Sequence, residues 1–422
     1  MSDTFRHFLR IGIHSEADFF RKGQPLYDAL IMNANLVQAT PSASAALVYQ
    51  LKKPFLIDPL TYAFSLNPKY LMSRSKGKSG GIRVKKSFTG LADSYFTDRS
   101  FLGSRPLQNG DFDIGDLTAR VLAFQKEVLV KAVGDAKELF SDIGRLSPAW
   151  LLAPYFPLRR SQDWNASLSL NVACIEAARA QGASPSAIVP VELEILREPG
   201  TLEKIADAYA AAKPDTVFLW IESFDEDRAD ESDLRIYCGL VARLAEAGTK
   251  PVNLFGGFFS CLAQCVGLAG FAHGLVYGEN RAFTPVVGGG QPPPRYYLKP
   301  AHVSMNVREA EVLLAGISPS DYLRANCDCA ICRQLFDGQA DLTNFAKFSE
   351  TNDQGKFIPR AYALCRFHFL FARKAEIAGM EMLPPQERLG RIAANVQFMD
   401  DLHAYDYAEH LKTWTKVIGE FC

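Results

Sequence analysis

The sequence contains no apolar run that approaches the roughly 20 residues a membrane-spanning helix requires, so we expect no membrane segment. It also has no strong charge of either sign, because 46 basic and 47 acidic residues leave a formal net charge of −1. A globally basic nucleic-acid binder is therefore excluded, and any such function must rest on a local patch. The 48% of hydrophobic residues indicates a folded protein with a substantial core.

Several catalytic motifs are missing as well. There is no P-loop, no H-E-x-x-H pair and no Ser, His and Asp order of a hydrolase triad. The nine cysteines are an odd number, most of them lie outside the spacing of a disulfide framework, and no signal peptide precedes them. We therefore expect a reducing, cytoplasmic location.

What is present is an alternation of short apolar runs and helical segments. Near-continuous apolar strands that alternate with helices favour a buried parallel sheet, and eight of them predict an α/β fold of the (β/α)8 TIM-like barrel type. An open doubly wound sheet is the alternative, but no glycine-rich dinucleotide motif follows the first strand. The predicted strands are Phe8–Ile13, Ala29–Asn33, Pro54–Ile57, Trp150–Ala153, Ala187–Val191, Thr216–Trp220, Pro251–Phe255 and Gly274–Tyr277. The predicted helices between the later strands are Leu168–Gln181, Thr201–Ala212, Asp233–Ala247 and Ser260–Gly270.

The 422 residues predict a barrel with an appendage. We expect the barrel over 1–290, with a basic insertion at about 69–110 and a long helix from Asp113 to Phe140. A glycine- and proline-rich segment from Gly288 to Pro294 can be neither helix nor central strand, so we interpret it as the exit from the barrel. A zinc-binding subdomain over 291–390 and a C-terminal helical segment over 391–422 are expected to follow.

The appendage carries a tight group of cysteines in a C-x-C-x2-C pattern. Cys327, Cys329 and Cys332 supply three thiols, and His368 follows at the head of an apolar helical run. Three thiolates and one imidazole form one of the ligand sets of structural Zn²⁺ sites. The alternatives are a four-thiolate set that uses Cys365, an iron–sulfur cluster, or buried thiols that bind nothing.

The insertion is strongly basic, with no acidic residue between Asp58 and Asp93. It follows the carboxyl end of a predicted barrel strand, the face where barrel active sites lie. A basic loop there suits a phosphate-backbone substrate, whereas the alternative is a solvated loop without function. The basic residues are Lys69, Arg74, Lys76, Lys78, Arg83, Lys85 and Lys86.

Acidic residues dominate the positions just beyond the predicted strands. Paired carboxylates suit a displacement at a sugar carbon, because one can attack while the other transfers the proton. Glu192 could instead pair with Arg159, Arg160 or Arg197 in a structural role. The candidate positions are Asn33, Asp58, Glu192, Glu222, Gly256, Gly257, Glu279 and Arg281.

Together these features resemble the tRNA-guanine transglycosylase superfamily over roughly residues 8–380. The first is the cysteine pattern with its distant histidine after a barrel. The second is Asp58 followed four residues later by Tyr62, where the family has an aspartate and a base-stacking aromatic residue. The third is Glu279, five residues after Gly274, where the family has its nucleophilic aspartate. The segment from Asp58 to Ala63 otherwise departs from the family motif, which favours the relatives that insert 7-deazaguanines into DNA.

The resemblance implies an enzyme, a pentosyltransferase that replaces guanine in nucleic acid, DNA rather than tRNA, with a 7-deazaguanine. Glu279 would attack C1′, Asp58 would manage the proton, and Tyr62 would stack on the base. Zn²⁺ would be structural, and the partners would be nucleic acid and the deazaguanine base, with a second copy of the chain or proteins of a modification system as further candidates. The alternatives are a catalytically silent nucleic-acid-binding barrel or protein scaffold, and a barrel hydrolase of a small glycoside or nucleoside.

Overall fold

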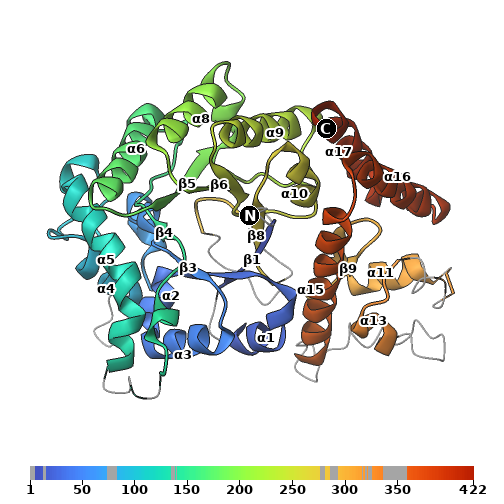
Figure 1. The fold of residues 1–422 in the computed structure, drawn as a ribbon, viewed down its shortest axis with the longest axis horizontal. Coiled ribbons are helices and arrows are strands. Elements are labelled where there is room, and N and C mark those ends of the chain that lie inside the picture. Colours follow the sequence, from blue (N-terminus) through green and yellow to red (C-terminus); the bar gives the residue numbers. More distant parts are fainter. Residues whose placement is uncertain are drawn as a thin grey trace.

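The computed structural model contains a closed barrel of eight parallel strands surrounded by helices, with a C-terminal region against one side (Figure 1). This confirms the predicted (β/α)8 fold. The structure describes residues 5–12, 16–73, 83–134, 138, 140–275, 281–285, 293–315, 317–318, 321, 326–335 and 359–422.

The barrel is closed by a contact between its third and fourth strands. The hydrogen-bonded order is β3-β2-β1-β8-β7-β6-β5-β4, and a parallel bridge between Leu56 and Trp150 joins the two ends. An open doubly wound sheet is therefore excluded. The strands are β1 Arg6–Ile11, β2 Ala29–Asn33, β3 Phe55–Asp58, β4 Leu151–Leu152, β5 Pro185–Glu192, β6 Thr216–Glu222, β7 Lys250–Asn253 and β8 Gly270–His273.

Alternation along each strand divides its residues between two cores, because successive side chains point to opposite faces. Phe8, Ile31, Leu56 and Phe218 belong to one buried cluster that fills the barrel. Their sequence neighbours, such as Leu9, belong to a larger cluster between strands and helices. Both faces of the sheet are buried, which explains why the strands are nearly continuous apolar runs.

The helices around the barrel agree with prediction where the periodicity is regular. α8 has the predicted bounds, and Asp113 caps α5 by accepting a hydrogen bond from the amide of Asp116 at 2.8 Å. α5 ends at Val133 rather than Phe140, before Gly134 at a φ of 47°. The helices are α1 Ala17–Lys22, α2 Ala34–Ala39, α3 Pro41–Leu51, α4 Lys86–Tyr95, α5 Ile114–Val133, α6 Trp164–Ala180, α7 Leu193–Leu196, α8 Thr201–Ala212, α9 Glu231–Glu246 and α10 Phe259–Leu262.

Two predictions near the end of the barrel are wrong. The helix expected over Ser260–Gly270 is only α10 and the 3-10 helix η8 (Ala263–Val266), which ends at Gly267 with a φ of 105°. The last strand is Gly270–His273. Gly274 and Leu275 of the predicted strand lie beyond it, and Val276 and Tyr277 lie outside the described residues. The sequence pattern missed this strand because it ends in a polar residue, His273. The His273 side chain faces outward, and its Nε2 lies 2.7 Å from Nε2 of His7.

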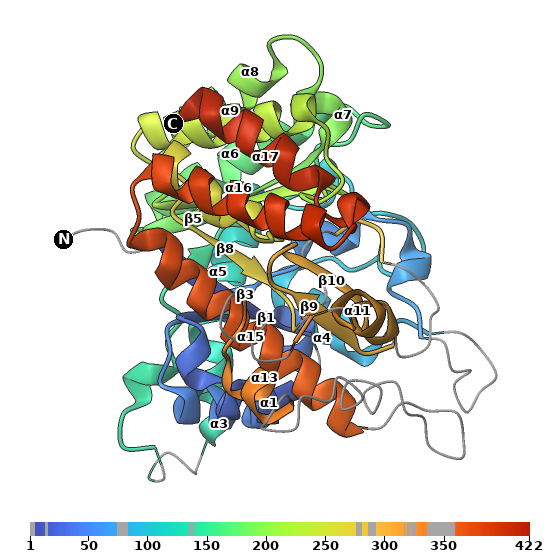
Figure 2. The ribbon, with the colours of Figure 1, turned by 90° about the vertical axis from the view of Figure 1, so that its right-hand side faces the viewer.

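The C-terminal region begins with a two-stranded antiparallel hairpin and continues in helices on one side of the barrel (Figures 1 and 2). α15 packs against β9 and α10, and α17 packs against α9 and α16. α16 crosses the boundary that the sequence suggested at residue 390. The elements are β9 Arg295–Leu298, β10 Val303–Asn306, α11 Val307–Leu314, α13 Ala330–Leu335, α15 Pro359–Glu381, α16 Pro385–Asp401 and α17 Glu409–Phe421.

A disulfide joins Cys265 of η8 to Cys422, directly after α17. The spacing of the cysteines indicates no disulfide framework, so this bond was not predicted. It fastens the end of the described chain to the barrel. Among the described helices, none has the length and apolarity needed to cross a membrane.

Candidate functional site

Asp58 lies at the carboxyl end of β3, where the sequence placed it, and its carboxylate is fully enclosed. Its side chain is 1% exposed. Oδ1 accepts hydrogen bonds from the Tyr155 hydroxyl at 2.7 Å and from the Leu60 amide at 3.1 Å. Leu60 has a φ of 55°, a left-handed conformation that is costly for a leucine. The backbone therefore holds a strained turn that aims an amide at this carboxylate.

Arg10 of β1 is the cationic partner of Asp58. Its Nη2 lies 3.2 Å from Asp58 Oδ2 and donates to Asn33 Oδ1 at 3.1 Å, which places the predicted Asn33 in the same cluster. Burial lowers the pKa of Arg10, whereas Asp58 opposes this effect. Arg10 Nη1 is buried and has no hydrogen-bond partner. The mouth of the barrel, at the carboxyl ends of its strands, thus contains a buried cation, Arg10, with one N–H group that has no hydrogen-bond partner.

Aromatic rings enclose this ion pair. Tyr62, in the 3-10 helix η3 (Thr61–Ser65), stacks on Tyr155 with 5.6 Å between ring centroids and meets Trp220 edge-on at 4.8 Å. Phe283 also meets Trp220, with 4.8 Å between ring centroids. Tyr62 is buried, and the space between Tyr62 and Tyr155 is too narrow for a base. A base could stack on Tyr62 only after one of these rings moves.

Burial and the adjacent Asp58 carboxylate raise the pKa of Tyr155 well above its usual value. Its hydroxyl therefore stays protonated and remains a donor to Asp58. Burial likewise raises the pKa of Tyr62.

Arg281 brings a second guanidinium to the mouth. Arg10 and Arg281 lie over the same ring, with guanidinium carbons 4.5 and 5.6 Å from the Phe255 centroid. The Arg281 guanidinium forms no hydrogen bond or ion pair with any residue that the structure describes. Two cations and one carboxylate, Asp58, meet here, so the cluster carries an excess positive charge and suits an electron-rich or anionic substrate group.

The backbone around Arg281 is tied to the end of β6. Its carbonyl accepts from Trp220 Nε1 at 2.9 Å and from the Ser223 amide at 3.2 Å. The Phe283 amide donates to Glu222 Oε1 at 2.8 Å. Burial raises the pKa of Glu222. The predicted Glu222 therefore lies at the carboxyl end of β6 and holds the backbone of Phe283 in place.

Other predicted residues lie outside this cluster. Glu192 binds Arg159 Nε at 3.1 Å and the Arg160 amide at 2.6 Å, the structural pairing that the sequence left open. The Gly257 amide donates to Glu226 at 2.8 Å, and a Cβ on Gly256 would meet Ser260 Oγ. These glycines serve a buried network around α10 rather than Asp58.

The catalytic and basic predictions are only partly covered by the structure. Glu279, Arg74, Lys76 and Lys78 lie outside the described residues. Four basic residues of the insertion are described, and all are exposed: Lys69, Arg83, Lys85 and Lys86. Lys86 begins α4 and therefore does not belong to a loop.

Four predicted ligands do come together in the C-terminal region. The ligand atoms of Cys327, Cys329, Cys332 and His368 lie within 4.8 Å of one another, so this cluster could hold a metal ion. The Sγ atoms lie 3.9, 3.3 and 3.3 Å from His368 Nδ1. Cys365 is buried and does not belong to the cluster, so the four-thiolate set is not the one that is assembled.

The histidine of this cluster is oriented by its other nitrogen. His368 Nε2 donates to the Tyr297 carbonyl of β9 at 2.7 Å, so Nδ1 is the ring nitrogen that faces the three thiols and can bind a metal. Tyr296 stacks on the imidazole at 4.3 Å. His368 lies in the middle of α15 and not at the head of a helix, as the sequence suggested.

Sequence reasoning missed Arg10, Tyr155, Trp220, Phe255 and Phe283. Arg10 carried a signal, because a charged residue at an inward position of an apolar strand needs a buried partner. Tyr155 and Phe255 lie just after strands, but in the sequence an aromatic residue at such a position cannot be distinguished from an ordinary residue of the hydrophobic core.

No protein-family model and no curated protein matches the chain. Among solved structures, an intracellular xylanase from Thermoanaerobacterium saccharolyticum in complex with xylotetraose is 9% identical, with a TM-score of 0.36 over 69% of this chain and 90% of the xylanase. Eubacterium rectale Amy13B is 8% identical, with a TM-score of 0.31 over 89% of this chain and 80% of that chain. Similarity at this level carries no inference about activity.

Proposed function

We propose that this protein is a base-exchange enzyme that replaces guanine in nucleic acid, DNA in preference to tRNA, with a 7-deazaguanine. The observation that carries the proposal is the Asp58 cluster: a carboxylate at the carboxyl end of a barrel strand, inside an aromatic enclosure, beside a guanidinium with a free donor. A nucleobase offers flat faces for rings, N–H groups for a carboxylate and a carbonyl for an arginine. A Cys3His cluster after the barrel agrees with the same family resemblance.

The reaction would be a double displacement. The Glu279 carboxylate attacks C1′ of the flipped nucleotide, the glycosidic bond breaks, and guanine leaves with the bonding electrons and takes a proton from solvent water. The incoming deazaguanine then attacks C1′, loses its ring proton to Asp58 and releases Glu279, and Asp58 returns that proton to solvent. Support for Glu279 comes from Arg281, which follows it by two positions in the sequence and lies beside Asp58.

The enclosure must open for this chemistry. Asp58 is 1% exposed and Tyr62 is 2% exposed, so a base reaches the carboxylate only when one of the surrounding side chains moves. In this arrangement the basic residues near α4 would hold the phosphates outside the mouth.

The same closure favours a second candidate, a silent barrel that binds nucleic acid or scaffolds a complex. Every Asp58 oxygen already has a partner within the protein, which is also what a purely structural ion pair requires.

We infer further that the metal in the Cys3His cluster is Zn²⁺ and that its role is structural. Three sulfurs and one nitrogen complete a tetrahedral set without an open position for water. The cluster joins α13 to the middle of α15, so the ion would stabilise the fold directly.

Exchange of labelled guanine into DNA and tRNA tests the proposal. The metal-loaded protein should exchange the base, and Glu279→Gln and Asp58→Asn should each abolish exchange while nucleic-acid affinity stays within about twofold, because neither contacts the phosphates. Asp207→Asn is the matched control, since Asp207 is exposed and pairs with Arg243 on the outer helices α8 and α9. Wild-type exchange by both variants would remove Glu279 and Asp58 from the proposed reaction, and binding without exchange by the wild type would favour the scaffold.

A further inference from the structure

A second polar site lies away from the barrel mouth, in a cavity of about 390 Å³. Its walls come from the turn between β9 and β10, from α15 and α16, and from Asn326, the residue before the first cysteine of the metal cluster. The volume falls within the range of small-molecule pockets. No step of the proposed base exchange uses this cavity.

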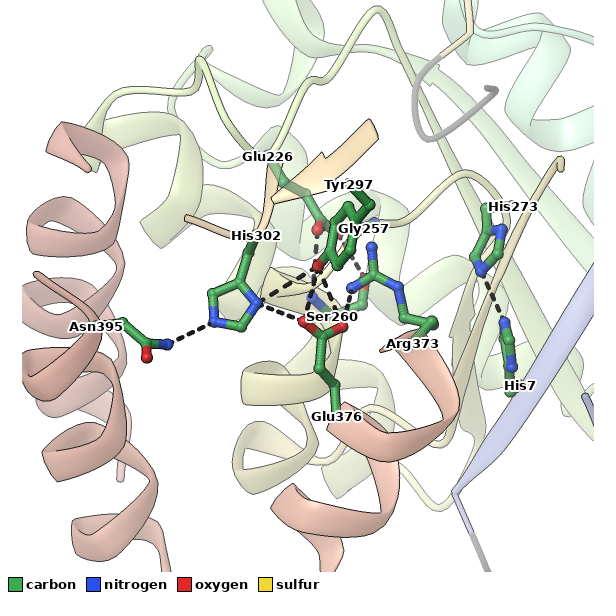
Figure 3. A network of polar contacts seen from close by, with 10 residues as sticks. All are labelled: His7, Glu226, Gly257, Ser260, His273, Tyr297, His302, Arg373, Glu376 and Asn395. Atoms are coloured by element: carbon green, nitrogen blue, oxygen red, sulfur yellow. Dashed lines mark hydrogen bonds and ion pairs between the residues drawn. The ribbon is translucent and has the colours of Figure 1, made fainter. Parts of the chain in front are cut away.

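One wall is a rigid polar network centred on His302 (Figure 3). His302 has a φ of 56°, a strained conformation, and its ring stacks on Phe258 with 3.4 Å between centroids. Its Nδ1 lies 2.7 Å from Glu376 Oε1, and its Nε2 lies 3.0 Å from Asn395 Nδ2. The network holds the lining groups in fixed positions before any ligand arrives.

The acid of this network has no capacity left for a ligand. Glu376 also accepts from the Tyr297 hydroxyl at 2.9 Å and pairs with the buried Arg373 at 3.3 Å. Burial alone would raise the pKa of Glu376, but His302 and Arg373 outweigh it and hold the pKa below its usual value. Glu376 is therefore ionised, and Arg373 balances its charge.

The unused polar groups of the cavity are mainly donors. Asn326 Nδ2 is buried without a hydrogen-bond partner. Lys299 and Arg391 line the same cavity, and neither forms a hydrogen bond or ion pair with the residues that the structure describes. With Glu376 already balanced by Arg373, these two cations leave the cavity with an excess of two positive charges.

We propose that this cavity binds a small phosphorylated molecule, a phosphate monoester. A phosphate monoester carries about −1.5 to −2 charge and three acceptor oxygens at neutral pH, which matches two cations and one amide donor. Arg391 can bind two oxygens at once, and Lys299 adds a point charge. The ligand contacts α16, the β9–β10 turn and the residue before Cys327, so its binding stabilises the C-terminal region.

Calorimetric titration of the full-length, metal-loaded protein with inorganic phosphate at constant ionic strength tests the site. The wild type should bind one phosphate per chain, and phosphate should raise its melting temperature. Lys299→Gln with Arg391→Gln should weaken binding at least about tenfold. Ala394→Phe, on an exposed cavity position, should do the same by filling the space while keeping every charge. Lys412→Gln on α17 with Arg243→Gln on α9 removes an equal charge away from the cavity and should bind like the wild type.

Three results would overturn the proposal: no heat of phosphate binding to the wild type, unchanged affinity in both the double variant and Ala394→Phe, or equal binding of succinate. Competition between single-stranded DNA and phosphate for the cavity would also overturn it, because the ligand would then be a nucleic-acid backbone. None of these outcomes depends on base exchange at the barrel mouth.

Discussion

The buried ion pair between Arg10 and Asp58 makes a prediction that does not depend on the reaction. Replacing Arg10 with Met leaves the Asp58 carboxylate enclosed with only Tyr155 and the Leu60 amide as partners. The charged atoms lie 3.2 Å apart, so their gross attraction is about 5 kcal/mol at an effective dielectric of about 20. An uncompensated buried charge usually costs about 3–5 kcal/mol. We expect Arg10→Met to lower the free energy of unfolding by up to about that amount, because Arg281 still interacts with the Asp58 charge.

A double-mutant cycle separates this ion pair from simple packing. Asp58→Asn should cost less, about 1–3 kcal/mol, because its amide oxygen still accepts from Arg10. The double variant contains no unpaired charge at this position, so its loss should fall short of the sum of the single losses by at least about 2 kcal/mol. Urea unfolding of metal-loaded proteins, followed by circular dichroism, measures all three.

The exposed pair of Arg243 and Asp207 is the matched control. It has comparable geometry, at 2.7 Å, but its side chains are 44% and 59% exposed. Its coupling energy should stay below about 1 kcal/mol. Additive losses in the Arg10 and Asp58 cycle would refute the view that a desolvated ion pair forms the floor of the mouth.

Three further predictions concern other parts of the molecule. Cys329→Ser should lose bound metal, about one Zn²⁺ per chain by elemental analysis, whereas Cys365→Ser on α15 should retain it. Lys85→Ala with Lys86→Ala should flatten the dependence of DNA affinity on salt by up to about two counterions, and an unchanged slope would assign these residues to solvent. Burial, and then the charge of Arg373, lowers the pKa of His7 to about 3, and that of His273 is lowered as well. Because both folded-state pKa values lie below the unfolded value near 6.5, the free energy of unfolding falls as pH falls below about 6.5. Between pH 7.5 and pH 5 this loss should be about 2 kcal/mol per histidine. The variant His7→Leu with His273→Leu should not show it in urea titrations at the two pH values.

The sequence predicted the barrel because its signals are local and repeated. Each strand is a short apolar run, and α8 and α9 each bury one regularly spaced face, with Asp230 as the N-cap of α9. The metal cluster was predictable for a similar reason, since three of its ligands lie within one short segment. The position of the eighth strand was predicted wrongly because Gly270–His273 is short and ends in a polar residue. The apolar run that follows it has the stronger strand pattern.

The site was harder to predict, because its residues come from several strands, and only the folded barrel shows which strand ends lie next to one another. Asp58 and Asn33 were found from their positions after strands, but the partner that makes Asp58 distinctive is Arg10, 48 residues earlier. Trp220, Phe255 and Phe283 become an enclosure only when the barrel closes. A pattern of apolar residues cannot distinguish an aromatic wall around a carboxylate from ordinary core.

The metal cluster and the barrel are connected by one rigid helix, and this connection sets the consequence of metal loss. On α15, His368 belongs to the cluster and donates to the Tyr297 carbonyl, and the next residue, Phe369, packs against both Tyr297 and His273 of β8. Five positions after His368, Arg373 is fully buried against barrel side chains. Loss of the ion would therefore release the helix that covers His7 and His273 on the outside of β1 and β8. Metal-free protein should show increased hydrogen exchange in β1 and β8 while β5 and β6, on the far side of the barrel, keep their protection. Uniform loss of protection across all strands would instead mean that the barrel and the C-terminal region unfold as one unit.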